Sequence, residues 1–111
     1  MVDYVPQRGH FIRIRFEPQA GHEQMGIRPA LVISHTAFNN TRGFTFVCPI
    51  SNTKRQNPFH IVIPDQQVVT GVIMADQLRS LDYLARRAEF IGECPEALVQ
   101  KVLSRIRRIL F

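Results

Sequence analysis

Two segments of the chain, 11–16 and 59–63, alternate apolar and polar residues, which is the pattern of a strand with one buried face. In the first, the faces separate Ile12, Ile14 and Phe16 from Phe11, Arg13 and Arg15. A third segment, 30–34, is an apolar run and predicts a strand buried on both faces.

Two more apolar runs, 44–50 and 71–75, predict further strands. Pro49, near the end of the first run, indicates a sheet edge or a bulge because proline has no N–H to donate. The segment 35–40 predicts a short helical turn, and the residues 39–43 predict a chain reversal. Two interpretations stay open further along: a short strand over 86–91, or a helix over 81–89.

The end of the chain predicts a helix that begins near Pro95, since proline suits a first helical position. Glu96 in its first turn and arginines in its last turn match the helix dipole. Apolar residues follow at helical spacing: Leu98, Val99, Val102, Leu103, Ile106, Ile109 and Leu110. We expect this helix to pack on the strands, and its wide apolar stripe, with Phe111, also offers a dimer contact.

Many short strands and one terminal helix predict a mostly β protein, a small β-barrel with helices, and 111 residues suit a single domain over 1–111. No run approaches the roughly 20 apolar residues of a membrane span, and the start of the chain has no apolar signal-peptide core. Cys48 and Cys94 fit no metal spacing, so a reduced, cytoplasmic protein is the expectation, with Cys48 in the core.

The chain is basic, with 14 Lys and Arg against 9 Asp and Glu and a formal net charge of +5. This charge suits a polyanion such as nucleic acid, or an acidic protein, although a solvated surface without a partner explains it equally. The histidines are scattered along the chain and predict no metal site and no cofactor: His10, His22, His35 and His60.

The segment 21–29 reads Gly-His-Glu-Gln-Met-Gly-Ile-Arg-Pro and leads into the apolar strand. It presents an imidazole (His22) and a carboxylate (Glu23) between two flexible glycines, and a guanidinium (Arg28) two residues after the second glycine, which fits phosphate chemistry. The alternative is a polar loop in which Arg28 pairs with a nearby carboxylate.

The run GHEQMGIRPALVIS resembles the signature of the MazF/PemK (Kid) family of toxin endoribonucleases, with Glu17-Pro18 where Asp-Pro is usual. The resemblance extends over nearly all of the chain. It implies an SH3-like barrel of the CcdB/MazF-like type, assembled as a symmetric homodimer with RNA in a groove at the dimer interface. It also implies a cognate antitoxin, acidic and partly disordered, that covers this groove.

The resemblance implies the toxin of a type II toxin–antitoxin system, an mRNA interferase that stops translation and growth. Such an enzyme cuts single-stranded mRNA at a short sequence without a metal, because the 2′-hydroxyl attacks and leaves 2′,3′-cyclic phosphate and 5′-OH ends. The alternatives are a non-catalytic toxin of related fold that inhibits DNA gyrase, and an SH3-like binding module. Glu23 and Arg28 favour the nuclease, since a pure binder has no need of that pair.

This reaction needs a base, an acid and stabilisation of the charged phosphorane. Glu23 is the candidate base, although its ordinary pKa is low for the task. Arg28 is the candidate for phosphate stabilisation, and the resemblance implies that it also acts as the acid. His22 titrates near neutrality and can replace either residue, or it merely contacts RNA.

Two further segments resemble the family. Where members read Pro-x-Thr, with a threonine that contacts the scissile phosphate, this chain has Ser51, and Thr53 is a possible substitute. The segment 71–77 is similar to G-V-x-x-x-D-Q, with Met74 where some members carry a catalytic arginine. Asp76 is therefore an alternative base or orienting group, or simply a strand-end carboxylate.

The loop 51–58 is the best candidate for base selection, because proteins read single-stranded bases with loops and aromatic rings. The same charges are equally explained as solvated surface. The candidates for RNA contacts are Arg13, Arg15, Gln24, Asn52, Thr53, Lys54, Arg55, Phe59, Gln77 and Arg79.

Overall fold

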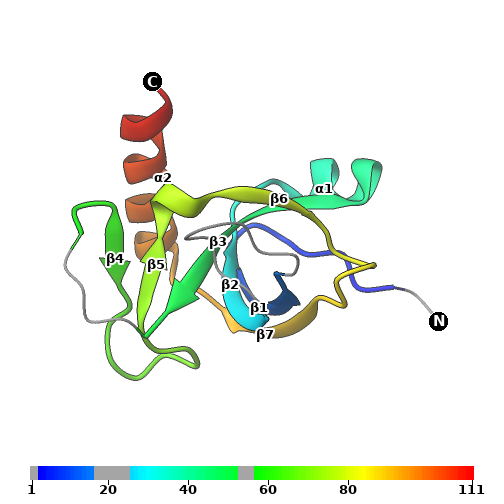
Figure 1. The fold of residues 1–111 in the computed structure, drawn as a ribbon, viewed down its shortest axis with the longest axis horizontal. Coiled ribbons are helices and arrows are strands. Elements are labelled where there is room, and N and C mark those ends of the chain that lie inside the picture. Colours follow the sequence, from blue (N-terminus) through cyan, green and yellow to red (C-terminus); the bar gives the residue numbers. More distant parts are fainter. Residues whose placement is uncertain (1–2, 17–25, 53–56) are drawn as a thin grey trace.

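A computed structural model describes residues 3–16, 26–52 and 57–111 of the chain (Figure 1). In these residues, seven strands combine with two α-helices and one short 3-10 helix. In chain order they are β1 (His10–Arg15), β2 (Ile27–Val32), α1 (Thr36–Arg42), β3 (Phe44–Ser51), β4 (His60–Val62), β5 (Val72–Met74), η1 (Ala75–Gln77), β6 (Arg79–Asp82), β7 (Glu89–Glu93) and α2 (Glu96–Leu110).

The strands form one antiparallel sheet in the order β4-β5-β3-β2-β1-β7, with β6 paired to the first half of β3. Within the described residues, β4 and β7 end this path, so the sheet is open rather than closed into a complete barrel. The predicted class, mostly β with a C-terminal helix, is confirmed.

Strand β3 is the centre of the sheet. It pairs with β2 along one edge, and along the other edge it pairs first with β6 and then with β5. Pro49 lies just before the paired residues Ile50 and Ser51, where β5 takes over from β6. Of the two alternatives predicted for Pro49, a sheet edge or a bulge, the edge strand is wrong because β3 has partners on both sides; Pro49 lies at the interruption where β3 changes partner strands.

The two faces of the sheet carry separate core clusters, because successive side chains of a strand point to opposite faces. One face packs against α2, and we call this cluster the helix-side core: Phe11, Leu31, Ile33, Cys48, Ile50, Ile61, Ile63, Val69, Ile73, Ala75, Cys94, Leu98, Val99, Val102 and Ile106. The other face carries a second cluster, which we call the strand-side core: Ile12, Ile14, Phe16, Ala30, Val32, Val47, Leu81 and Tyr83. Figure 1 shows α2 standing beside β4 and β5, with α1 at the opposite end of the sheet.

The predicted packing of the terminal helix on the strands is confirmed, and the predicted burial of 30–34 is confirmed except at Ser34, which is half-buried. Phe11, predicted on the same face as Arg13 and Arg15, is fully buried because it belongs to the helix-side core under α2. Strand β2 begins at Ile27, three residues before the predicted start.

The helix considered for 81–89 is wrong, because β6 and β7 occupy the two ends of this region. The chain reverses between them through hydrogen bonds from Arg86 N–H to the Asp82 carbonyl (3.0 Å) and from Ala88 N–H to the Tyr83 carbonyl (2.9 Å). Arg87 sits in the left-handed backbone region, at φ +54°, which helical residues do not adopt. The competing prediction, a strand, is confirmed with later bounds.

Asn39 ties three parts of the fold together and predicts a stability effect. Its buried side chain donates to the Pro6 carbonyl (2.7 Å) and accepts from the Ser34 hydroxyl (2.5 Å). The backbone carbonyl of Asn39 accepts from the Tyr83 hydroxyl (2.9 Å). Asn39→Ala leaves the buried Pro6 carbonyl without this donor, so we expect a loss of about 2 kcal/mol in the free energy of unfolding, measured by urea titration. The control is Asn40→Ala, at an exposed position of the same helix. An equal, small effect of both variants would contradict this assignment.

Candidate functional site

Strands β2 and β3 bring together an arginine and a serine on one face of the sheet. Ala30 lies across from Pro49 in the register of this pair, and the same register continued by two residues sets Arg28 across from Ser51. Directly opposed residues of an antiparallel pair project to the same face. Arg28 is exposed and Ser51 half-buried, so this continued register puts a guanidinium and a hydroxyl on the same face, two residues beyond the last paired positions of β2 and β3.

Gly71, just before β5, lies close to the Ser51 backbone. Its φ is +118°, a conformation that favours glycine, and a Cβ placed on it would lie 2.3 Å from the Ser51 carbonyl oxygen. Thr70, one residue earlier, donates its hydroxyl to the Asn52 side-chain oxygen (3.3 Å). The chain entering β5 therefore fixes the position of the segment that follows β3.

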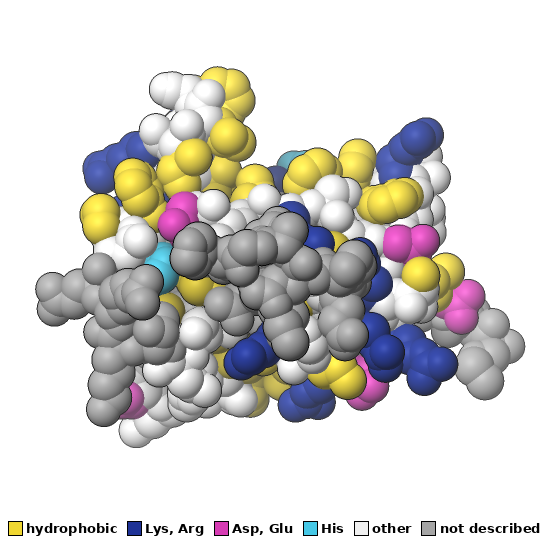
Figure 2. All heavy atoms as spheres, in the orientation of Figure 1, with side chains coloured by type: hydrophobic (Ala, Val, Ile, Leu, Met, Phe, Trp, Pro, Cys, Tyr) yellow, Lys and Arg dark blue, Asp and Glu magenta, His cyan; other side chains and the backbone are white. Residues whose placement is uncertain are grey.

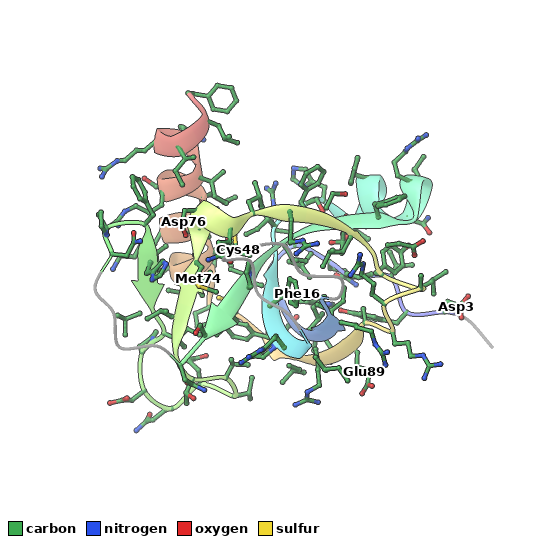
Figure 3. All side chains as sticks on the ribbon, in the orientation of Figure 1. Asp3, Phe16, Cys48, Met74, Asp76 and Glu89 are labelled. Atoms are coloured by element: carbon green, nitrogen blue, oxygen red, sulfur yellow. The ribbon has the colours of Figure 1, made fainter. Side chains whose placement is uncertain are left out.

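Beyond β5, the chain enters η1 with Asp76 and Gln77, which line a shallow hollow of about 170 Å³ together with Leu78 and Arg79. Asp76 is exposed, and its carboxylate lies 3.5 Å from His60 Nε2. Figure 3 shows Met74 and Asp76 along this part of the chain, with Cys48 nearby on β3. The Ala75 N–H donates to the Phe59 carbonyl (3.1 Å), which joins β4 to the start of η1.

Arg79 also belongs to this face, because Arg79 of β6 is directly opposite Val47 of β3, a member of the strand-side core. Its guanidinium carbon is 5.7 Å from the centre of the Phe16 ring, a cation–π contact. Arg79 is half-buried, so this side chain packs along the strand-side core and reaches the hollow beside Gln77.

The structure does not bring Arg13 and Arg15 together with Arg28. Ile14, between them on β1, is the residue across from Arg28, so its two neighbours project to the opposite face. There they line a separate hollow of about 160 Å³ with Arg86, Arg87, Ile27 and Glu89. Figure 3 places Glu89, the partner of Arg13 in the β1–β7 register, far across the view from Asp76. In Figure 2, lysine and arginine side chains gather near that end of the molecule.

Six of the predicted site residues lie outside the described residues: His22, Glu23, Gln24, Thr53, Lys54 and Arg55. The described candidates divide into two groups. Arg28, Ser51, Asn52, Phe59, Asp76, Gln77 and Arg79 belong to β2, β3 and the chain from β4 to β6, whereas Arg13 and Arg15 lie on the far face.

The sequence pattern did not single out two residues of this region, Gly71 and His60. Gly71 was only the first residue of a predicted strand and of the segment similar to G-V-x-x-x-D-Q, although a Cβ at this position would lie 2.3 Å from the Ser51 carbonyl oxygen. His60 was one of the scattered histidines. The alternation of 59–63 predicts that His60 faces the side opposite to Ile61 and Ile63. Its position beside Asp76 depends on the pairing of β4 with β5.

The nearby thiol is not a nucleophile. Burial, and secondly the Asp76 carboxylate, raise the pKa of Cys48 to about 12, so this group is a neutral thiol at physiological pH. Cys48 and Cys94 are both free and buried. Within the ranges that the structure describes, no three His, Cys, Asp or Glu residues gather in a geometry that could hold a metal ion. The polar groups present suit binding of a phosphate by a guanidinium and a hydroxyl, with a carboxylate beside it.

Comparison with known proteins gives three concordant results. Residues 7–110 match the family model described as PemK-like, MazF-like toxin of type II toxin–antitoxin system. The Endoribonuclease toxin MazF of Escherichia coli (strain K12) is 34% identical over 107 residues, which cover 96% of each chain.

Among solved structures, MazF from Deinococcus radiodurans superposes with a TM-score of 0.93 at 42% identity, over 97% of this chain and 98% of that one. A MazE–MazF structure from the same organism superposes with a TM-score of 0.85 at 36% identity, over 97% of each chain.

Proposed function

Because this chain belongs to the PemK-like, MazF-like family of type II toxins, we propose that it cuts single-stranded mRNA at the face that carries Arg28 and Ser51. The match covers 96% of the Endoribonuclease toxin MazF and 81% of the Endoribonuclease PemK of Escherichia coli, and both names favour a nuclease over the gyrase-binding alternative. The observation that carries the proposal is the register that sets Arg28 beside Ser51 on an accessible face.

In the proposed reaction, the 2′-hydroxyl of the RNA attacks the adjacent phosphorus, and the 5′-oxygen leaves. This forms a 2′,3′-cyclic phosphate and a 5′-OH end. Negative charge grows on the phosphorane oxygens, and the Arg28 guanidinium offers donors in a planar fork that matches two of them. The Ser51 hydroxyl donates a further hydrogen bond to the phosphate.

The proton transfers are assigned from the sequence. Glu23 is the proposed base, which takes the 2′-proton, and Arg28 or His22 is the proposed acid at the leaving oxygen. Asp76 is the alternative base. The chemistry uses the substrate's own nucleophile, so the proposal includes no metal and no cofactor.

The proposed partners are single-stranded RNA, a cognate antitoxin and a second copy of this chain. A net charge of +5 supports binding to RNA and to an acidic antitoxin, and a relative has been solved as a MazE–MazF complex. Exposed apolar residues at the end of α2 support self-association, since Leu110 is 58% and Phe111 97% exposed. No helix in the described ranges is long and apolar enough to cross a membrane. We propose the cytoplasm, where mRNA is translated, as the place of action.

The hydroxyl of residue 51 predicts a graded effect on cleavage. Ser51→Ala removes one hydrogen bond to the phosphate, so we expect the cleavage rate to fall by about 10-fold. Ser51→Thr keeps the hydroxyl and restricts its rotation, and we expect this variant to cut at least as fast as the native protein. Single-turnover rates on one RNA oligonucleotide measure both. Equal rates for Ser51→Ala and the native protein would remove Ser51 from the site.

The proposal is tested by incubating the purified protein with a long single-stranded RNA in excess EDTA and mapping the product ends. We expect discrete cuts that leave 2′,3′-cyclic phosphates. A folded protein that leaves the RNA intact would overturn the nuclease assignment, and cleavage that EDTA abolishes would overturn the metal-independent mechanism.

A further inference from the structure

The hollow beside η1 has the composition of a nucleobase site. Asp76 offers a carboxylate acceptor, Gln77 an amide that both donates and accepts, and Leu78 an apolar surface. Arg79 completes the lining with a guanidinium whose carbon lies 5.7 Å from the centre of the Phe16 ring, and guanidinium groups also stack on bases. Edges of unstacked bases are read by such polar groups, and base faces by such flat or apolar groups.

The hollow lies close to the Arg28–Ser51 pair. Ser51 is across from Val72, and the same register continued by two residues sets Met74 across from Pro49. The Ser51–Val72 pair and the Pro49–Met74 pair are roughly 7 Å apart along the strands. Asp76 and Gln77 follow directly in η1. A nucleotide that neighbours the scissile phosphate therefore has a polar hollow beside it.

His60 holds the carboxylate of this hollow in place. It lies across from Met74 in the β4–β5 pair, and its side chain is only 9% exposed, whereas that of Asp76 is 34% exposed. His60 Nε2 is 3.5 Å from the Asp76 carboxylate, and His60 Nδ1 is buried and has no hydrogen-bond partner among the residues that the structure describes.

The nitrogen of His60 that lies beside the exposed Asp76 carboxylate is Nε2. A buried imidazole next to an exposed carboxylate favours one position of that carboxylate, in which it then meets a ligand. A carboxylate repels the phosphates of RNA, so its natural partners there are N–H donors on base edges. Carboxylates accept hydrogen bonds from exocyclic amino groups of bases.

We propose that the hollow of Asp76, Gln77, Leu78 and Arg79 is a base-selecting subsite, in which Asp76, positioned by His60, favours a base with an exocyclic amino group over one without it. This inference rests on the proposed RNA cleavage and adds its sequence preference. Adenine, cytosine and guanine carry such a group and uracil does not. Asp76 thereby selects the base, and His60 acts through Asp76.

The test compares RNA oligonucleotides that differ in one base beside the cut. Three pairs are used: adenine and purine, guanine and hypoxanthine, and cytosine and uracil. Each pair differs by an amino group or its replacement. For the native protein we expect kcat/KM to favour the amino-bearing base by about 10-fold at one position. Asp76→Asn should reduce this ratio to about 2-fold. His60→Ala should do the same, and His60→Gln, which keeps a side-chain N–H, should retain part of the preference.

Two controls separate this role from a structural one. Glu89→Gln removes an exposed carboxylate at the far hollow and should keep the full ratio. The double variant His60→Ala/Asp76→Asn should lose no more preference than Asp76→Asn alone, because one residue acts through the other. Melting temperatures establish that each variant is folded, and Asp76→Asn and His60→Gln suffice if His60→Ala is not.

The outcomes distinguish this inference from the proposed function. If the native protein cuts RNA but Asp76→Asn keeps the native ratio, or slows all substrates equally, the base-selecting role is wrong and the nuclease assignment stands. If the native protein does not cut, dissociation constants for the same oligonucleotides decide. A preference for the amino-bearing base that is lost in Asp76→Asn supports the subsite without catalysis, and its absence overturns both.

Discussion

Replacing Arg28 with alanine is expected to lower the rate of RNA cleavage by at least about 100-fold and to leave the protein folded. Removing one preorganised donor to a developing oxyanion costs about 10²–10³ in rate, and Arg28 offers several. The side chain is exposed, so its truncation opens no cavity. Strand β2 remains held because its backbone pairs with β1, where Ile14 lies across from Arg28. Single-turnover cleavage and the melting temperature measure the two effects separately.

Two variants make the Arg28 result specific. Arg28→Lys keeps the charge but loses the planar fork, so we expect a rate between those of the native protein and Arg28→Ala. Arg107→Ala removes an exposed arginine of α2 and lowers the net charge equally, and it should cut at nearly the native rate. Native activity in Arg28→Ala, or an equal loss in Arg107→Ala, would show that general charge and not this guanidinium supports the reaction.

Gly71→Ala is expected to damage both stability and cleavage, although residue 71 carries no reactive group. The new Cβ would lie 2.3 Å from the Ser51 carbonyl oxygen and 3.0 Å from the Asn52 side-chain oxygen, so the segment after β3 has to move. The backbone at φ +118° adds strain for any residue with a side chain. We expect a loss on the order of 3 kcal/mol in the free energy of unfolding and at least about 10-fold in cleavage rate.

Gly43→Ala is the matched control for Gly71→Ala. Gly43 ends α1 at φ +72°, and a Cβ there meets no atom within 4 Å. Its cost is therefore backbone strain alone, roughly 1–2 kcal/mol, with cleavage unchanged. Urea unfolding and single-turnover cleavage are measured on both variants. If Gly71→Ala cuts as fast as Gly43→Ala, the contact of Gly71 with Ser51 does not control the site.

The elements that could be predicted from the sequence are those with a strong local period. Strand β1 and helix α2 show periods near 2 and 3.6 because each buries one face, and the apolar run of β3 predicts a buried strand. Strand β6 was missed because its four residues alternate too briefly to indicate a strand: Arg79–Asp82. The left-handed backbone at Arg87, which excludes the helix, leaves no mark in composition.

The candidate site was predictable by residue type but not by arrangement. The sequence pattern and the family resemblance identify Arg28, Ser51 and Asp76 one by one. Their neighbours follow from non-local pairing, which sets Arg28 across from Ser51 and brings His60 of β4 to the side chain of Asp76. The same pairing places Arg13 and Arg15 on the face opposite to Arg28, because they alternate along β1 with Ile14, which lies across from Arg28. A period of 2 reveals two faces and does not say which strand lies beside them.

The central claim is that the RNA supplies its own nucleophile to a phosphate bound at the face of Arg28 and Ser51. The most direct test uses one RNA oligonucleotide with several mapped cut positions, and replaces a single 2′-hydroxyl, that of the nucleotide before one cut, with hydrogen. The account predicts that this cut disappears, that the others continue at their former rates, and that the protein still binds the substituted RNA. Continued cleavage at the substituted position would contradict it, because another nucleophile would then be attacking the phosphorus.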